Sequence, residues 1–234
     1  MIASTGQHGR HEERERASGA CEYLVQVGLV LAVGALARGV RHDGRMDATR
    51  TFVAIALPAH VRASIRELTE RGRRTGPAGL RWADPDQAHL TLAFLGDQDD
   101  AALERVRDCV RAVASAHAPF GADLRGAGAF PRGDAARVLW LGWGEGADAV
   151  GALHGALRSA LSEVGIALEA RRFEAHVTLA RARAPRDVRA LVDGSASWRS
   201  ERWTVAAIDL MASRLTRTGA EHVRLEQCSL GGDG

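Results

Sequence analysis

Two five-residue stretches, HLTLA at residues 89–93 and HVTLA at 176–180, repeat a histidine and a threonine two positions apart. The two motifs stand 87 residues apart, which is longer than the roughly 20–50 residues of a solenoid repeat. Such a spacing suits two similar halves of one duplicated domain. Both stretches are rich in aliphatic and β-forming residues, so each is predicted to be a strand.

Side-chain alternation gives each predicted strand one polar and one apolar face. Successive side chains of a strand point to opposite faces. His89 therefore shares a face with Thr91, and His176 shares a face with Thr178, while the aliphatic residues between them face a core. Two halves related by a pseudo-two-fold axis would display both His–Thr pairs into one central cleft.

Two imidazoles and two hydroxyls in one cleft suit in-line displacement at phosphorus without a metal. A neutral imidazole accepts a proton from water, and a protonated one donates to the leaving oxygen. Threonine hydroxyls hydrogen-bond non-bridging phosphate oxygens. A metal site is disfavoured, because no third ligand has suitable spacing and no HExxH motif occurs. The other candidates are interpreted as ordinary polar residues: His60, His117, His154 and His222.

The rest of the chain predicts an α+β fold of two similar lobes, with antiparallel sheets and flanking helices. Strands are predicted over residues 51–58, 80–84, 88–96, 119–130, 137–144, 172–182, 203–215 and 221–230, the last two as a closing antiparallel pair. Apolar residues at helical spacing predict helices around residues 61–68, 103–113 and 150–164. Gly96 is expected to end its strand. No P-loop and no GxGxxG motif occurs.

The net charge and the cysteine content indicate which partners and which cellular compartment suit the chain. All 31 basic residues are arginine, and the net charge of +2 is too small to indicate a nucleic-acid surface by itself. Cys21, Cys109 and Cys228 lie far apart without a CxxC pair. This favours free thiols in a reducing cytoplasm over a disulfide framework or a zinc site.

Residues 1–45 join no later pattern. The polar stretch 6–16 is expected to be disordered. Residues 23–37 are apolar but shorter than the about 20 residues that a membrane span needs. The favoured interpretation is a loose extension, or translated sequence upstream of a natural start at Met46; a membrane anchor and a helix packed on the domain stay open. Residues 46–234 are expected to form a single bilobal domain.

The segments around both motifs, RWADPDQAHLTLAFLGD and RRFEAHVTLARAR, resemble the signature strands of the two-histidine (2H) phosphoesterases. The most similar branch is the RNA 2′,3′-cyclic phosphodiesterases, also known for a 2′–5′ RNA ligase activity. The resemblance spans about residues 50–230 and implies a bilobal α+β duplication with two HxT strands facing a central cleft. It further implies that His89 and His176 are catalytic and that Thr91 and Thr178 bind the phosphate.

Two flanking residues gain roles from the same resemblance. Phe94 matches a position beside the substrate base, with a core residue as the alternative. Arg181 matches a position near the phosphate, with a solvated strand end as the alternative. Ala175 departs from the family, which usually has proline before the second motif histidine; its absence loosens the approach to His176 but removes no chemistry.

The resemblance implies a monomeric cytoplasmic enzyme that needs no metal or cofactor. It would open an RNA or nucleotide 2′,3′-cyclic phosphate to a 2′-phosphate, with His176 as the base and His89 as the acid. Three alternatives stay open: a non-catalytic binder of nucleotides or RNA ends, a hydrolase of another cyclic phosphodiester such as ADP-ribose 1″,2″-cyclic phosphate, and a 2′–5′ RNA ligase.

Overall fold

The computed structural model describes residues 49–170, 172–215 and 220–231. The expectations for residues 1–45, including Cys21 and the apolar stretch 23–37, therefore lie outside the described residues. Within the described part of the chain, no helix combines the length and the apolar character needed to cross a membrane.

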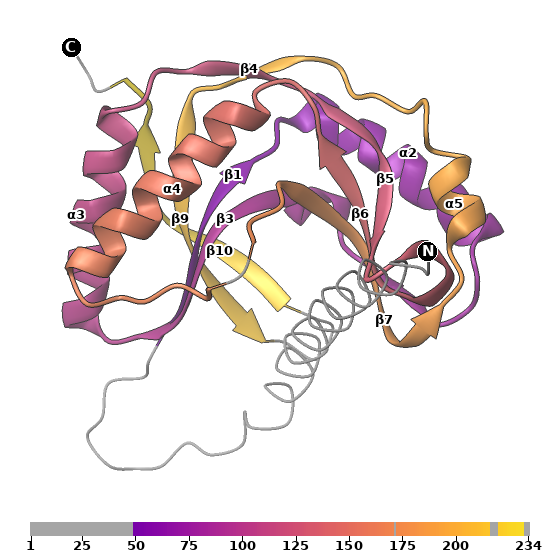
Figure 1. The fold of residues 1–234 in the computed structure, drawn as a ribbon, viewed down its shortest axis with the longest axis horizontal. Coiled ribbons are helices and arrows are strands. Elements are labelled where there is room, and N and C mark those ends of the chain that lie inside the picture. Colours follow the sequence, from indigo (N-terminus) through magenta and orange to yellow (C-terminus); the bar gives the residue numbers. More distant parts are fainter. Residues whose placement is uncertain (1–48, 171, 216–219, 232–234) are drawn as a thin grey trace, which may run out of the picture.

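A twisted sheet of eight strands forms the centre of the molecule (Figure 1). Seven of the strands follow the order β10-β9-β1-β3-β7-β6-β5, and the eighth, β2, also pairs with β7. All of its pairings are antiparallel, as the predicted α+β class requires. One half of the sheet consists of β1 (Thr49–Ala56), β3 (His89–Gln98), β9 (Ala207–Leu215) and β10 (Ala220–Ser229). The other half consists of β2 (Leu80–Trp82), β5 (Leu124–Phe130), β6 (Ala136–Trp143) and β7 (His176–Arg186).

The helices pack on the apolar side of this sheet (Figure 1). They are α2 (Ala59–Thr75), α3 (Asp100–Ser115), α4 (Ala147–Glu163) and α5 (Arg189–Asp193). The predicted helical spacing is confirmed in α2, where Val61, Ile65 and Leu68 are buried at intervals of three to four residues. They belong to the same buried cluster as Val53 and Ile55 of β1, so this face of the sheet forms the core.

The duplication is visible in the order of the elements. The units β1–α2–β3 and β6–α4–β7 have the same arrangement, and both helices are 17 residues long. The helices are also exchanged between the halves. Helix α4 contacts β3 of the first half, and α2 lines a cavity with Leu139 and Leu179 of the second. The two halves therefore share one core.

Gly96 does not end its strand, contrary to the prediction. β3 continues to Gln98, and Gly96 has a φ of 72°. Thr51 pairs with Gly96 and Phe52 with Phe94, which leaves Leu95 as an extra residue on β3. Such a bulge bends a strand without stopping it, and glycine supplies the positive φ.

Two predicted strands are each divided in two. The segment 119–130 breaks at Asp123 into β4 (Phe120–Ala122) and β5, and the segment 203–215 breaks at Ala206 into β8 (Trp203–Val205) and β9. β4 and β8 pair with each other in a separate two-stranded sheet. At the first break, the buried Asp123 carboxylate accepts the Glu145 backbone N–H at 2.7 Å. The local sequence pattern does not predict this break, because the hydrogen bond joins Asp123 to a residue of another segment.

One further strand differs in its bounds, and one short helix was not predicted. The strand predicted over residues 172–182 begins only at His176 and continues to Arg186. The five-residue helix α5 was not predicted, because it is too short to show helical periodicity.

Candidate active site

The two motif strands are neighbours at the centre of the sheet. They are joined by the pair Leu90 and Val177, which occupy equivalent motif positions and are fully buried. Because the strands are antiparallel, His89 and Thr178 lie towards one end of this pair, and Thr91 and His176 towards the other. The central pair therefore relates the two motifs by a pseudo-two-fold axis.

Both motif strands also share one bulge. Leu92 is an extra residue of β3 against β1, and Leu179 is an extra residue of β7 against β6. The burial pattern of the first seven residues is the same in the two strands. A one-residue bulge shifts the alternation of side chains. The third residue after each threonine, Phe94 or Arg181, therefore returns to the face of the motif.

Each motif histidine makes the same hydrogen bond. His89 Nδ1 lies 2.8 Å from the carbonyl of Gln87, and His176 Nδ1 lies 2.7 Å from the carbonyl of Glu174. A neutral imidazole in this bond donates from Nδ1, so Nε2 is the nitrogen that takes up and releases a proton. The two imidazoles are thus held in equivalent orientations.

A short turn places Gln87 ahead of the first motif. A 3₁₀ helix covers Pro85–Gln87, and Pro85 occupies its first turn. The carboxylate of Asp84 caps this turn by accepting the N–H of Asp86 at 3.0 Å. The local sequence ADPDQ therefore fixes the carbonyl that orients His89.

Aromatic rings surround both histidines, but they differ between the halves. The His89 ring lies 5.0 Å from the rings of Phe52 and His222, measured between centroids. The His176 ring lies 5.2 Å from Phe130 and 6.2 Å from Trp140. The first histidine thus has a second imidazole beside it, whereas the other has only phenyl and indole rings among these contacts.

Burial lowers the pKa of His89 from 6.5 to about 4. The hydrogen bond to Gln87 opposes this shift, while the charges of His222 and Arg181 add to it. Without a bound anion, His89 is therefore mostly neutral at pH 7.

The structure places both flanking residues on the motif face. Phe94 is 42% exposed, so the alternative of a core residue is wrong, and the Arg50 guanidinium carbon lies 5.0 Å from the centre of its ring. Arg181 lies within β7 rather than at its end, so the strand-end alternative is wrong as well. Its Nη2 lies 3.5 Å from Thr178 Oγ1, and its charge reaches His89. Arg181 is therefore close to motif residues of both halves.

Three of the four histidines that were expected to be ordinary polar residues are so. His117 and His154 bond through Nδ1 to the carbonyls of Val113 and Leu92, and His60 is exposed on α2. His222 was wrongly interpreted as a satisfied polar residue. Its Nδ1 is buried without a hydrogen-bond partner among the described residues, and its ring contacts His89. No local sequence signal could reveal this, because the contact joins β10 to β3.

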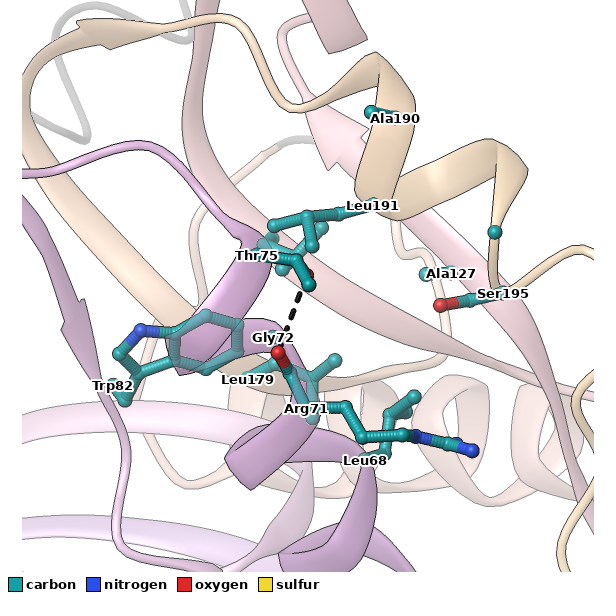
Figure 2. Close-up of a pocket in the computed structure, with 12 residues that line it drawn as sticks. Leu68, Arg71, Gly72, Thr75, Trp82, Ala127, Leu179, Ala190, Leu191 and Ser195 are labelled. Carbon is teal, nitrogen blue, oxygen red and sulfur yellow. Dashed lines mark hydrogen bonds between the residues drawn. The ribbon is translucent and has the colours of Figure 1, made fainter.

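A cavity of about 260 Å³ lies on the other, helix-covered side of the sheet (Figure 2). It is bounded by α2, α5 and the second half, with Gly72, Trp82 and Leu191 among its lining residues. The hydroxyl of Thr75 donates to the Arg71 carbonyl at 3.2 Å. Neither His–Thr pair lines the cavity, and the motif residue that does, Leu179, is an aliphatic residue of the core, so the cavity is not the candidate active site.

The ionisable side chains outside the motif form no obvious metal centre. Among the residues that the structure describes, no group of three or more His, Cys, Asp or Glu side chains is arranged to hold a metal ion. Cys109 and Cys228 are buried free thiols, and burial raises the pKa of both.

Comparisons with known proteins identify the family of the chain. The model of the 2′-5′ RNA ligase superfamily matches residues 57–217. An RNA 2′,3′-cyclic phosphodiesterase of Thermus thermophilus is 34% identical over 194 residues, which cover 79% of this chain and 91% of the relative. One of Methanothermobacter thermautotrophicus is 27% identical, covering 76% of this chain and 96% of the relative.

Solved structures show the same fold. A Thermus thermophilus protein superposes with a TM-score of 0.66 at 31% identity, covering 79% of this chain and all of the other. Escherichia coli LigT complexed with 3′-AMP has a TM-score of 0.62 at 26% identity, covering 79% of this chain and 99% of LigT. The family model covers more than half of the chain, so the chain belongs to the 2′-5′ RNA ligase superfamily.

Proposed function

We propose that this chain is an RNA 2′,3′-cyclic phosphodiesterase that opens the cyclic phosphate to a 2′-phosphate. The observation that carries the proposal is the duplicated His–Thr pair, with two imidazoles oriented identically by backbone carbonyls on one face of the central sheet. The relatives that bear this name and span most of the chain support the same reaction.

In the proposed reaction, water attacks phosphorus and the bond from phosphorus to O3′ breaks. His176 Nε2 takes the proton of the attacking water, and His89 Nε2 gives its proton to the departing O3′. Each histidine keeps its Nδ1–H on a backbone carbonyl throughout, so its orientation does not change during proton transfer.

To act as the acid, His89 must be protonated, but the unliganded site favours its neutral form. With a pKa of about 4, His89 is mostly neutral at pH 7, which is the state of a base. The negative charge of a bound phosphodiester would stabilise the imidazolium and raise this pKa. The assignment of roles therefore depends on the bound substrate and is open to direct test.

The remaining residues of the face would bind the substrate. Thr91 and Thr178 would donate hydrogen bonds to the non-bridging oxygens, and Arg181, beside Thr178, would contribute positive charge there. The exposed ring of Phe94 would stack on the terminal base, with Arg50 on the ring as a further cation. We expect the protein to act as a monomer in the cytoplasm, a reducing compartment in which the thiols of Cys109 and Cys228 would stay free.

Product analysis tests the proposal. An RNA oligonucleotide ending in a 2′,3′-cyclic phosphate is incubated with the chain, and the terminal 2′- and 3′-phosphates are separated. We expect catalytic formation of the 2′-phosphate, which is lost when both motif histidines are replaced by alanine. Binding of the oligonucleotide without turnover would favour the non-catalytic alternative, and a 3′-phosphate product would contradict protonation of O3′.

A further inference from the structure

A third imidazole lies directly against one of the two motif histidines. The rings of His222 and His89 are 5.0 Å apart with an interplanar angle of 85°, so they meet edge to face. Phe52 completes a three-ring cluster, because its ring lies 5.0 Å from each of the two imidazoles. His222 belongs to the edge strand β10, which β9 and β1 separate from β3 in the sheet.

Gln87 ties His222 to the hydrogen bond that orients His89. The backbone N–H of His222 donates to Gln87 Oε1 at 2.9 Å. The backbone carbonyl of the same Gln87 accepts from His89 Nδ1 at 2.8 Å. One residue thus holds both the strand that carries His222 and the ring that His222 touches.

Among the described residues, the ring that meets the second motif histidine edge-on is a phenyl. Phe130 lies edge-on to His176, with centroids 5.2 Å apart at an angle of 88°. A phenyl ring is therefore sufficient for packing at such a position. An imidazole there places a buried Nδ1 without a hydrogen-bond partner among the described residues, which is a cost that packing alone does not explain.

We propose that His222 is a positioning residue for His89, which it holds through edge-to-face ring contact and through the shared Gln87. This inference rests on the proposed function in one respect, because it takes His89 to be catalytic. It also makes the first half of the active site different from the second, although the two motifs are alike.

The contact has an electrostatic consequence. Two imidazolium ions this close and partly buried repel each other, so the pair favours a single proton. Burial lowers the pKa of His222, as it does for His89. Among the described residues, this pair also meets Phe52 and Gln87, which are uncharged, and Arg181, whose positive charge opposes protonation of His89. His222 thus helps to keep His89 neutral until an anion binds.

Three variants of His222 separate these effects. His222→Ala removes the ring, and we expect kcat on the cyclic phosphate to fall about tenfold to a hundredfold with little change in KM, because the reacting nitrogen is misplaced. His222→Phe restores the ring and copies the environment of His176, so most of the lost kcat returns. His222→Gln removes the charge, so His89 titrates at a higher pH than in the wild type. His60→Gln, on the exposed face of α2, is the control and changes none of these quantities.

A second readout needs no substrate. Ring ¹⁵N NMR reports the tautomer and the titration of His89 directly. We expect the Nδ1–H tautomer in the wild type and in His222→Phe, and a mixture of tautomers in His222→Ala. The tautomer of His89 can be measured even if the chain does not turn over the cyclic phosphate. The experiment therefore distinguishes a failure of this inference from a failure of the proposed function. An unchanged tautomer together with unchanged kcat in His222→Ala, or a loss confined to KM, would overturn the positioning role.

Discussion

The two motif histidines have the same hydrogen bond but different surroundings. Both donate Nδ1–H to the carbonyl two residues earlier, Gln87 or Glu174. His89 is then packed against His222 and His176 against Phe130. A motif of two residues can be repeated exactly in sequence and still give two histidines with different ring neighbours, because those neighbours come from other strands.

Anion binding should depend on pH through His89. Burial lowers the pKa of His89 to about 4, and a bound anion raises it, so binding takes up a proton. We expect the affinity for sulfate, which stays a dianion in this range, to increase as the pH falls from 7 towards 4, by up to about tenfold per pH unit. Isothermal titration calorimetry measures the affinity. An equally steep pH dependence in His89→Gln would show that another group takes up the proton.

At the scale of elements, two glycines at helix α4 differ in whether the backbone conformation and the surrounding space accept a Cβ. Gly146 caps its N-terminus with a φ of 77°, and a Cβ there would lie 2.5 Å from the Gly121 carbonyl oxygen. Gly155 is exposed within the helix, and a Cβ there would meet no atom within 4 Å.

Alanine substitutions should therefore have opposite effects on stability. We expect Gly155→Ala to raise the free energy of unfolding by about 0.5–1 kcal/mol, because alanine favours the helix. We expect Gly146→Ala to lower it by about 1–3 kcal/mol, because alanine is strained at positive φ and clashes. Urea denaturation measures both. Equal effects from the two variants would contradict the placement of this helix.

Helices and strands could be predicted from the sequence where a pattern of neighbouring residues specifies them. Alternation in HLTLA and HVTLA gave both motif strands and their polar faces, and the spacing of Val61, Ile65 and Leu68 gave α2. The bulges at Leu92 and Leu179 could not be predicted, because they depend on the register against β1 and β6. The breaks at Asp123 and Ala206 were missed for a similar reason, since β4 and β8 pair only with each other.

The whole molecule depends on contacts that no sequence pattern reveals. The duplication was expected from the repeated motif, but the exchange of helices between the halves was not, because α4 meets β3 only in the folded chain. The contact of His222 with His89 is of the same kind. The repeated pattern identified the two His–Thr pairs, the resemblance added the flanking Phe94 and Arg181, and the structure supplied their surroundings.

The chain should not need its first 45 residues. They carry no motif, and the family match begins at residue 57. A chain that begins at Met46 is therefore expected to keep the melting temperature and the turnover of the full sequence. Thermal denaturation and the cyclic phosphate assay check this. A large loss of both would mean that residues 1–45 contribute to the folded domain.

Turnover should also be independent of added metal, because the proposed mechanism uses two imidazoles for proton transfer. We expect EDTA to leave kcat unchanged in the cyclic phosphate assay. The control is a dialysed sample with Mg²⁺ or Mn²⁺ restored. Strong inhibition by EDTA that is reversed by one of these ions would contradict a metal-independent reaction.

The central claim is that two histidines share the proton transfers, and a comparison of leaving groups tests it most directly. The kcat/KM of the wild type, His89→Ala and His176→Ala is measured on a nucleoside 2′,3′-cyclic phosphate and on a nitrophenyl phosphodiester that the wild type accepts. General acid or base catalysis contributes about 10²–10⁴-fold, so the effects are easily measured. A ribose alkoxide needs an acid to leave, whereas nitrophenolate does not.

We therefore expect His89→Ala to lose far more activity on the cyclic phosphate than on the nitrophenyl ester, and His176→Ala to lose heavily on both. The reverse contrast would exchange the acid and the base and keep the two-histidine mechanism. Turnover of the cyclic phosphate near the wild-type rate by both single variants would contradict the account.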